Sequence, residues 1–308
     1  MRVSDQMIFD RAMVDGGAAR TRLDEATARA STGVRVVHPG DDPAAAGLVT
    51  AERVRMQRLE AIASAAGRAS DELAAADGAL SNVANALARA SELAVQLGSE
   101  PYSAAERAAG AKEVQGLLAS ILSELNVKVG NRYVFGGTSD GSAPFDGLVL
   151  DAAGNVDAAA TGVYRGDANV RKVEIAPGVY QDASVRADVA LRGAGGPPAA
   201  DVIATLAELA NALAANDRAG AAATLGRLDR SITQLSTARG QAGAIMNALD
   251  TAVAANDAAR DDAEKRIATL ADADVIQAAS ELALAQHALE AALTATAQSF
   301  KLSLLGKL

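Results

Sequence analysis

The stretch that decides the fold lies near the C-terminus, where residues 275–296 read VIQAASELALAQHALEAALTAT. Apolar or small side chains recur there at alternating steps of three and four positions, at Val275, Ala278, Leu282, Ala285, Leu289, Ala292 and Thr296. This spacing predicts one apolar stripe along an α-helix, narrow enough for a coiled-coil seam. A second stripe begins at the N-terminus with Val3, Met7 and Val14, so we expect the two ends of the chain to pair.

Helix-start signals divide the first half of the chain. Asp42-Pro43 places an N-cap carboxylate before a proline, which predicts the start of a helix that continues to about Leu97. Ser103-Ala104-Ala105-Glu106 is a capping-box pattern and predicts a third helix, ending at about Val129. Both helices carry leucines and valines at helical spacing, so each is expected to pack against a partner.

The middle of the chain differs in amino-acid composition from both ends. Residues 133–196 are richer in Gly, Val and Asp, and Pro177-Gly178 is a turn signal. A period of two predicts a strand through Val185, Ala187, Val189 and Leu191. Helix is expected again from about Ala199, with interruptions near Asn216 and at residues 272–274.

These patterns predict a mainly α-helical fold with a small β insert. Both termini would form an elongated coiled-coil bundle, and an antiparallel β domain would point outward from it. We expect a terminal helical coiled-coil domain from residues 1–44 with 268–308, an inner helical bundle from 45–132 with 199–267, and an outer β domain from 133–198.

Composition limits the classes of function. Hydrophobic residues make up 50% of the 308 residues but aromatic residues only 3%, so helices must pack closely through small side chains. A net charge of −9 argues against nucleic acid as a partner, because phosphate binding needs clustered Lys and Arg. The chain has no cysteine, which suits either redox environment.

Neither a membrane span nor a signal peptide is expected. The alanine-rich segment 283–297 is interrupted by Gln286, His287 and Glu290. The first six residues lack the apolar centre of a signal peptide. We therefore expect no membrane partner, and export, if the protein leaves the cell, by another route.

No residue pattern predicts catalysis. His38 and His287 are the only histidines and neither has suitable neighbours in the sequence, while Asp41 and Asp42 fit helix capping better than acid–base chemistry. No phosphate-binding loop surrounds Gly136-Gly137. We expect no catalytic, cofactor-binding or metal-binding residues, and no enzyme.

The amphipathic helices allow two interpretations: a bundle closed within the molecule, or stripes completed by neighbouring subunits. Gly16-Gly17 weakens the first helix, which favours the second interpretation. The residues predicted to pack between subunits are Val3, Met7, Val14, Val275, Leu282, Leu289 and Leu293. A cytosolic coiled-coil signalling module, with seams closed inside one dimer, is the alternative from another class.

Specific segments resemble a known family. Residues 30–46, ASTGVRVVHPGDDPAAA, resemble the flagellin superfamily pattern S-[ST]-G-x-R-[IV] followed by D-D-[PA]. Residues 270–275, LADADV, and the final Ser303-Leu304-Leu305 are similar to the other end of that superfamily. Residues 130–138, GNRYVFGGT, with Pro144-Phe145 and the segment 164–167, are similar to its hook–filament junction branch.

The resemblance implies a structural subunit of the bacterial flagellum, secreted by the flagellar type III apparatus without a cleaved signal peptide. Its implied partners are a neighbouring hook-associated protein, flagellin, further copies in a ring and a cytosolic export chaperone. The terminal helices would line the axial core, and Arg35, Asp41, Asp42 and Asn131 would lie at the shoulder of the inner helices. Flagellin itself, the filament subunit, is the alternative within the family.

Overall fold

The computed structural model describes residues 2–194 and 199–305, which form two compact units. Unit 1 contains Met1–Arg58 and Ala258–Leu308, and unit 2 contains Leu59–Asp257. The division falls inside two long helices, α2 (Pro43–Leu97) and α6 (Arg218–Ala271), so each unit holds part of both. These are two units where the sequence suggests three domains, and the three-domain scheme stays a prediction.

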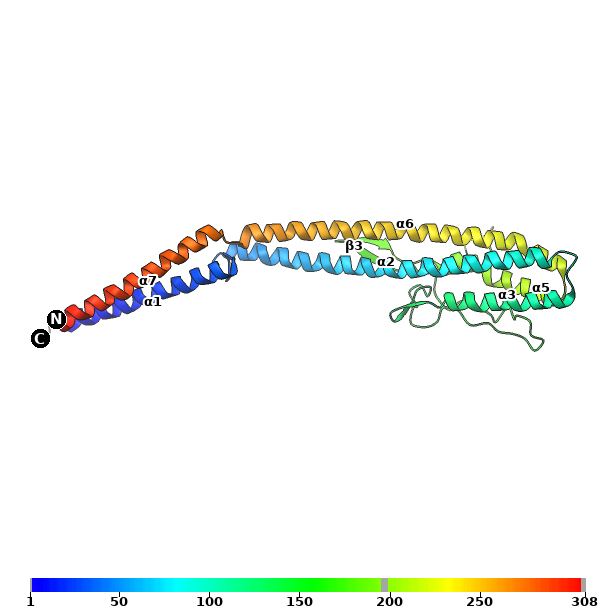
Figure 1. Cartoon of the computed structure of the whole chain (residues 1–308), viewed down its shortest axis with the longest axis horizontal. Helices are drawn as coiled ribbons and strands as arrows, with labels where there is room; N and C mark the ends of the chain where they lie inside the picture. Colours follow the sequence, from blue (N-terminus) through cyan, green and yellow to red (C-terminus); the bar gives the residue numbers. More distant parts are fainter. Residues whose placement is uncertain (1, 195–198, 306–308) are drawn as a thin grey trace. The chain divides into compact units, whose positions relative to one another are not determined.

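Unit 1 is built from the helices at the two ends of the chain. Helix α1 (Arg2–Thr32) and helix α7 (Val275–Leu305) run side by side (Figure 1). The predicted helix start is confirmed, because the Asp42 carboxylate accepts a hydrogen bond from the backbone N–H of Ala45 at 3.0 Å. The predicted interruption is also confirmed, since α6 ends at Ala271 and α7 begins at Val275.

Unit 2 contains the rest of α2 and α6 with three further helices, α3 (Ala104–Glu124), α4 (Ala187–Arg192) and α5 (Val202–Ala214). The capping box at the start of α3 is confirmed: the backbone N–H of Ser103 donates to the Glu106 carboxylate at 2.6 Å, and the N–H of Glu106 donates to the Ser103 hydroxyl. Helix α3 ends five residues before the predicted Val129. The break between α5 and α6 is marked by Asn216, whose φ of 59° is left-handed.

One hydrophobic core joins the helices of unit 2. Helix α3 packs against α5, and both contribute to a core with α2 and α6. Alanines such as Ala66, Ala76 and Ala90 are completely buried in it, so the small side chains let neighbouring helices approach closely. The large side chains buried with them are Leu73, Leu80, Leu87, Leu118, Ile121, Leu125, Ile203, Leu206 and Leu209.

In residues 2–194 and 199–305, the named strands form two short antiparallel hairpins. Strand β1 (Lys128–Val129) pairs with β2 (Arg132–Tyr133), and β3 (Lys172–Ala176) pairs with β4 (Val179–Asp182). The register of the second hairpin places Val173 opposite Gln181, and its turn uses Gly178 at a φ of 79°. A mainly helical fold with a small antiparallel β insert is therefore confirmed.

The predicted strand through residues 185–191 is wrong. The structure forms helix α4 there, and its buried residues Ala187, Ala190 and Leu191 follow helical spacing. Ala187 and Leu191 are four positions apart, a spacing that places two residues on one face of either a strand or a helix. In so short a segment, only the burial of Ala190 beside them distinguishes the helix from the strand.

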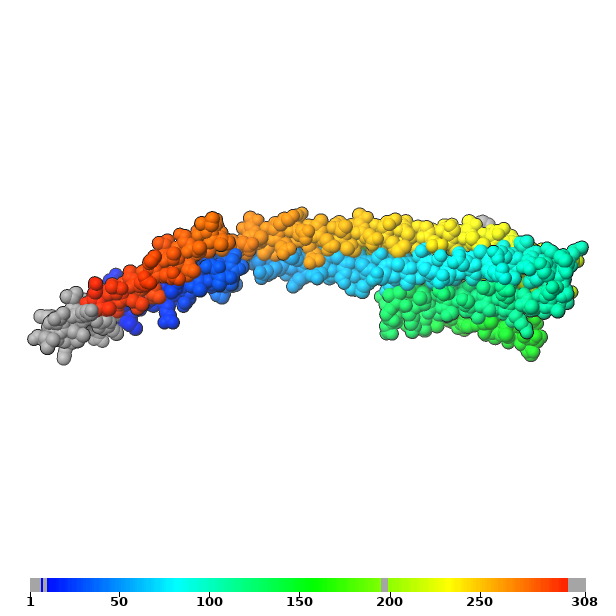
Figure 2. Space-filling model, viewed as in Figure 1, coloured from blue at the N-terminus to red at the C-terminus, as the bar shows by residue number. Residues whose placement is uncertain are grey.

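The described residues of the middle segment contribute to the core of unit 2. Phe135, Phe145 and Val156 belong to the same buried cluster as the helices. Figure 2 shows the green irregular segment lying against α3 in unit 2, where Gln115 of α3 donates to the carbonyl of Gly154 at 3.0 Å. Burial raises the pKa of Tyr164 to about 12, and its hydroxyl lies within 3.0 Å of the Phe135 carbonyl oxygen. The insert is thus packed into unit 2.

Candidate functional site

The paired helices α1 and α7 meet along a seam of small side chains. Ala19 and Ala26 of α1 and Ala278 of α7 are buried in it, while Leu282 and Leu289 are half-buried. The guanidinium of Arg29 binds the carboxylate of Glu281 across the seam at 3.2 Å. The stripe from Ala278 to Thr296 therefore closes within the molecule, against α1, whereas Val275 stays exposed. The predicted pairing of the two ends is confirmed.

The stripe chosen on α1 does not form this seam. Half-buried and buried positions recur on α1 at steps of four and three, at Ala12, Gly16, Ala19, Leu23 and Ala26. Met7 and Val14 lie on the opposite face and are 68% and 69% exposed. The side chain of Val3 lies outside the described residues. The expectation that this stripe pairs with α7 is wrong for Met7 and Val14, which instead remain available to a partner.

Helix α7 also keeps large apolar side chains on its surface. Val275 is 74% exposed and Leu293 59% exposed, as suits two residues predicted to contact other subunits. Sequence reasoning missed Ile276, Leu284 and Met13, which are 84%, 66% and 60% exposed. The available signal was a large apolar residue outside the predicted stripe of its helix. The subunit-packing role of all these residues stays a prediction.

A junction of backbone and charged groups lies beside the seam. The backbone N–H of Arg35 donates to the carbonyl of Ala271 at 2.6 Å, and that of Ala273 donates to the carbonyl of Gly33 at 2.8 Å. The Arg35 guanidinium reaches both the Asp42 carboxylate at 3.2 Å and the carbonyl of Leu270 at 2.8 Å. The connector after α1 is therefore fastened to the end of α6.

Of the two neighbouring aspartates, only Asp42 caps α2 as expected, whereas Asp41 accepts hydrogen bonds within the connector. The backbone N–H groups of His38 and Val37 hold the pKa of Asp41 below its usual value. The N–H of Ala45 and then the Arg35 guanidinium lower the pKa of Asp42. Arg35, Asp41 and Asp42 thus lie together in unit 1. Asn131 does not join them, because it is an exposed residue in the β1–β2 turn of unit 2.

Both histidines lie on the surface of unit 1. His38 is exposed in the connector, and the Nδ1 atom of His287, on the surface of α7, lies 3.7 Å from the carboxylate of Glu290. In the part of the chain that the structure describes, no group of three or more Asp, Glu or His side chains is placed to hold a metal ion. Over the same residues, every helix is too short or too polar to span a bilayer.

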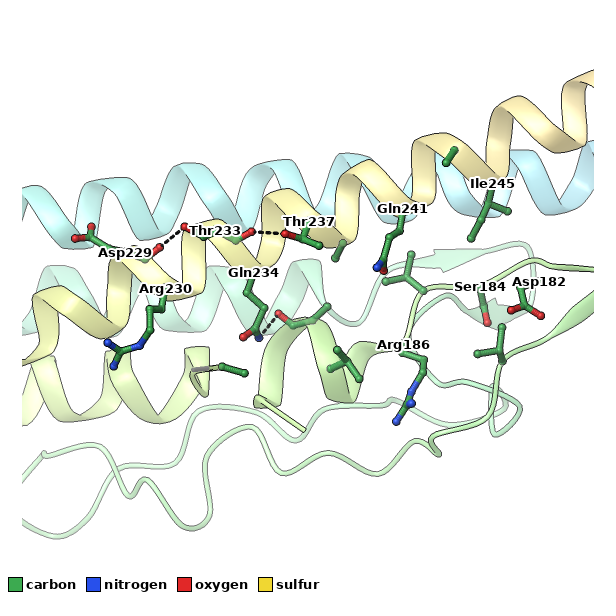
Figure 3. A pocket seen from close by; sticks show the side chains of 17 residues that line it. Asp182, Ser184, Arg186, Asp229, Arg230, Thr233, Gln234, Thr237, Gln241 and Ile245 are labelled. Carbon is green, nitrogen blue, oxygen red and sulfur yellow. Dashed lines mark hydrogen bonds between the residues drawn. The ribbon is translucent and has the colours of Figure 1, made fainter. Parts of the chain in front are cut away.

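A groove of about 940 Å³ lies along α6 in unit 2 (Figure 3). One wall is the face of α6 from Asp229 to Ile245, and the other includes Val185, Val189 and Ala190. Its walls are mostly apolar. Gln234 is directed across the groove, where its amide nitrogen donates to the carbonyl of Ala190 at 2.9 Å (Figure 3).

Several polar groups along this groove are hydrogen-bonded within the fold. The hydroxyls of Thr233 and Thr237 donate to carbonyls one turn earlier in α6. The Ser184 hydroxyl accepts a hydrogen bond from the backbone N–H of Arg171 at 3.0 Å. The groove therefore offers shape and apolar surface, with several of its polar groups bonded to the backbone.

Family models match both ends of the chain. The bacterial flagellin N-terminal helical region matches residues 3–140, and the bacterial flagellin C-terminal helical region matches residues 225–306. The flagellar hook-associated protein 3 of Salmonella typhimurium (strain LT2) is 31% identical over 147 residues, and that of Escherichia coli (strain K12) is 31% identical over 146. The alignments cover 47% of this chain and 46% of each relative. The match thus spans about half the length of these curated relatives.

Solved structures share the fold at lower sequence identity. A flagellar hook-associated protein from Vibrio parahaemolyticus, described as putative, superposes with a TM-score of 0.65 at 19% identity, over 75% of this chain and 100% of that one. Hook-associated protein 3 from Legionella pneumophila gives a TM-score of 0.59 at 17% identity, over 72% and 98% of the two chains. Because flagellin helical regions match at both ends and together cover more than half of its length, the chain belongs to the flagellin superfamily.

Proposed function

We propose that the chain is a structural subunit of the bacterial flagellum, which joins the hook-associated zone to the flagellin filament. The observation that carries this proposal is the pairing of α1 with α7, the two segments matched by flagellin helical regions, with large apolar side chains left on the surface of the pair. An exposed apolar surface of this kind is typical of a subunit that is covered on assembly.

The proposed partners follow from these surfaces. A neighbouring hook-associated protein and flagellin would contact the subunit at its two axial ends, and further copies would contact it side by side in a ring. Val275, Leu293, Met7 and Val14, all exposed, would be covered by these neighbours, and Leu282 and Leu289 would hold α7 in register with α1. A cytosolic chaperone would cover the apolar surface of α7 before export.

The proposed arrangement keeps the three sequence domains. Residues 1–44 with 268–308 would lie in the axial core, and residues 45–132 with 199–267 in the surrounding shell. Residues 133–198 would face outward. Arg35, Asp41 and Asp42 would fix the shoulder between core and shell, supported by their contacts with Ala45 and Leu270. Asn131 would act separately, in the turn of the first hairpin.

The role is mechanical, and the location is the flagellum outside the cell. Export would use the flagellar type III apparatus, without a cleaved signal peptide. The absence of cysteine supports this route, because no disulfide can form between or within chains in transit. We propose no catalytic step, because the family is a structural one.

Flagellin is the second candidate, since the same helical regions define it. The junction role is favoured by the names of the curated relatives, both called flagellar hook-associated protein 3. A cytosolic signalling dimer would also bury the surface of α7, but it would never appear outside the cell. The three roles therefore differ in where the protein is found and in how many copies are present.

Immunogold labelling of intact flagella separates these roles. We expect one band of label at the tip of the hook, and none in a strain from which the gene is deleted. Label along the whole fibre would support flagellin instead. Label confined to the cytosol, with normal motility in the deletion strain, would overturn the flagellar role altogether.

A further inference from the structure

Two halves of the middle segment pair with each other over residues 144–165, which we call the insert arm. One antiparallel bridge joins Phe145 to Tyr164 at the base of the arm. A second bridge joins Leu150 to Val156, next to the turn at the tip. The arm therefore has two paired points, each able to fix the position of one of its ends.

The pairing of the two halves is interrupted between these bridges. Residues 145 and 150 of the first half are five positions apart, whereas residues 156 and 164 of the second half are eight apart. The additional residues lie in a turn, where the Asp157 carboxylate accepts hydrogen bonds from the N–H groups of Ala159 and Ala160 at 3.0 and 3.2 Å. The ladder between the halves is thus not continuous, and one bridge does not set the register of the other.

The side-chain amide of Asn126 pairs with the main chain at the first bridge. Asn126 follows α3, and its amide nitrogen donates to the carbonyl of Phe145 at 2.9 Å. Its amide oxygen accepts from the backbone N–H of Phe145 at 3.1 Å. Two such bonds to one residue reproduce the hydrogen-bonded pair of an antiparallel sheet. Asn126 therefore takes the place of a neighbouring strand beside Phe145.

Asn211 of α5 makes the same pair of contacts at the second bridge. Its amide nitrogen donates to the carbonyl of Val156 at 2.9 Å, and its amide oxygen accepts from the N–H of Val156 at 2.8 Å. Phe145 and Val156 are only 2% and 3% exposed. Because their backbone groups are shielded from water, each residue relies on its asparagine for these hydrogen bonds.

The other contacts from the helices also reach the main chain of the arm. The amide nitrogen of Gln115 in α3 donates to the carbonyl of Gly154 at 3.0 Å. The guanidinium of Arg192 in α4 donates to the carbonyl of Gly162 at 3.1 Å. In the part of the chain that the structure describes, the hydrogen bonds from α3, α4, α5 and Asn126 to the arm thus all go to its backbone.

We propose that Asn126 and Asn211 are the positioning residues of the insert arm, each pairing with the main chain at one bridge and holding one end. Recognition is of the backbone, so it depends on the direction and register of the arm and not on its exposed side chains. The inference goes beyond the proposed function, because it concerns how unit 2 orients a surface segment. In the proposed subunit the arm belongs to the outward-facing residues 133–198, so the two asparagines would set the surface presented there.

A side-chain amide suits both positions. It offers an N–H donor and a C=O acceptor in one plane, which match the C=O and N–H of a residue in an extended chain. The ionised carboxylate of Asp offers acceptors alone, and the side chain of Leu offers neither group. Substitutions by Leu and by Asp therefore separate pairing with the main chain from simple packing.

Asn211→Leu keeps the approximate size of the side chain but leaves the N–H and C=O of Val156 without partners. Hydrogen exchange of the purified chain should become about tenfold faster at the N–H groups of Val156 and Asp157. The N–H of Asp157 reports on the second bridge, because it donates to the carbonyl of Val149 at 2.9 Å. Asn85→Leu, at an exposed position of α2, is the matched control, and circular dichroism checks that the helices remain folded. Equal exchange in the two variants would overturn the assignment of Asn211.

Asn211→Asp gives a readout that a loss of packing would not produce. At pH 7 the ionised carboxylate cannot donate to the Val156 carbonyl and is repelled by it, so exchange at Asp157 should be faster than in the natural chain. At pH 4 the protonated carboxyl supplies the missing donor, and the difference from the natural chain should become smaller. The natural chain, measured at each pH, accounts for Asp151 and Asp157, the carboxylates already in the arm near its tip. The same difference at both pH values would overturn pairing with the main chain.

The two asparagines should act on separate ends of the arm. Asn126→Leu should speed exchange at the N–H groups of Phe145 and Asp146, which lie at the first bridge. It should leave exchange at Asp157 unchanged, because the interruption separates the two bridges. Asn211→Leu should do the reverse. An equal rise at both bridges in either variant would show that the arm opens as one piece, and would overturn separate positioning of its ends.

Exposed side chains of the arm test whether recognition is of the backbone. Val149 and Leu150 are 39% and 47% exposed. Val149→Thr with Leu150→Thr changes these side chains and keeps the main chain, so exchange at Val156 should stay close to that of the natural chain. A rise as large as that in Asn211→Leu would contradict recognition through the main chain.

Labelling of the hook tip is scored separately from exchange. An unlabelled tip in the natural strain would overturn the proposed function and leave the positioning of the arm standing, because exchange is measured on the purified chain. A labelled tip with unchanged exchange in both Asn126→Leu and Asn211→Leu would overturn the inference and leave the proposed function standing.

Discussion

The guanidinium of Arg35 lies 2.8 Å from the carbonyl oxygen of Leu270, a residue 235 positions further along the chain. The carbonyl belongs to the last turn of α6, where backbone acceptors have no partner inside the helix. A cation at this end also complements the helix dipole. Arg35 therefore ties the connector that follows α1 to the end of α6.

Replacing Arg35 by Ala should loosen this connector. The ion pair with Asp42 is exposed and contributes little, so the expected loss is about 1 kcal/mol, mainly from the bond to Leu270. Hydrogen exchange should become faster at the N–H groups of Arg35 and Ala273, which bond across the junction. Arg20→Ala, at an exposed site on α1, is the control. Equal exchange in both variants would show that Arg35 has no fastening role.

Leu289→Asp should separate α7 from α1. Leu289 is half-buried in the seam, so the substitution places a carboxylate against apolar side chains. We expect loss of incorporation into flagella and faster proteolysis of both terminal helices, with unit 2 still folded. Leu293→Asp adds the same charge at an exposed site, where a loss of incorporation without faster proteolysis is expected. Normal motility of the Leu289→Asp strain would contradict the packing assignment.

Arg107→Met should destabilise unit 2 by about 3 kcal/mol, because it leaves buried acceptors without a donor. The side chain is only 4% exposed, and its nitrogens bond the carbonyls of Leu97 and Ser99 and the amide oxygen of Asn216 at 2.7 to 3.0 Å. Urea unfolding followed by circular dichroism measures the effect. Arg107→Lys should be intermediate, since an ammonium cannot reach all three acceptors at once. If the urea midpoint of Arg107→Met equals that of the natural chain, water must satisfy the three acceptors in place of the guanidinium.

The hydrogen bonds that link Thr138 and Asn169 to the Asp167 carboxylate should depend on pH. Hydrogen bonds from the Thr138 hydroxyl, and then from the backbone N–H of Thr138, lower the pKa of Asp167 to about 2. Because the folded-state pKa of Asp167 is lower than its ordinary value of 3.8, the ionised carboxylate stabilises these contacts fully above pH 3.8. This stabilisation is lost as the pH falls through about 2. Exchange at the Thr138 N–H, extrapolated to a common intrinsic rate, should therefore rise between pH 4 and 2. Asp167→Asn should remove this dependence, and a rise of equal size in that variant would assign it to another group.

The helices were predictable because their signals are local. Asp42 and Ser103 carry caps that the structure confirms, and Asn216 marks a break that needs a left-handed residue. The seam positions of α7 were also predictable, because small residues at steps of three and four leave one face to be covered. The partner of that face was harder to identify, since either α1 or a neighbouring subunit can satisfy the same stripe.

The contacts that define the candidate surfaces could not be read from the sequence. Met7 and Val14 are apolar and seven positions apart, but the seam on α1 runs through the small residues Ala19 and Ala26 on another face. Alanine carries no signal that separates a buried position from an exposed one in such a chain. The alignment of Glu52 with Arg266 likewise depends on how α2 and α6 pack, which no local pattern encodes.

The carboxylate of Asp42 has a second task besides capping α2, because it also binds the guanidinium that holds the end of α6. A pulling force on the connector would consequently load the first turn of α2 and the last turn of α6 at the same moment. The hydrogen bonds of Arg35 and Asp42 would share this load, so they would have to break together. We therefore expect the connector to separate at a higher force than it would if these bonds broke one after another.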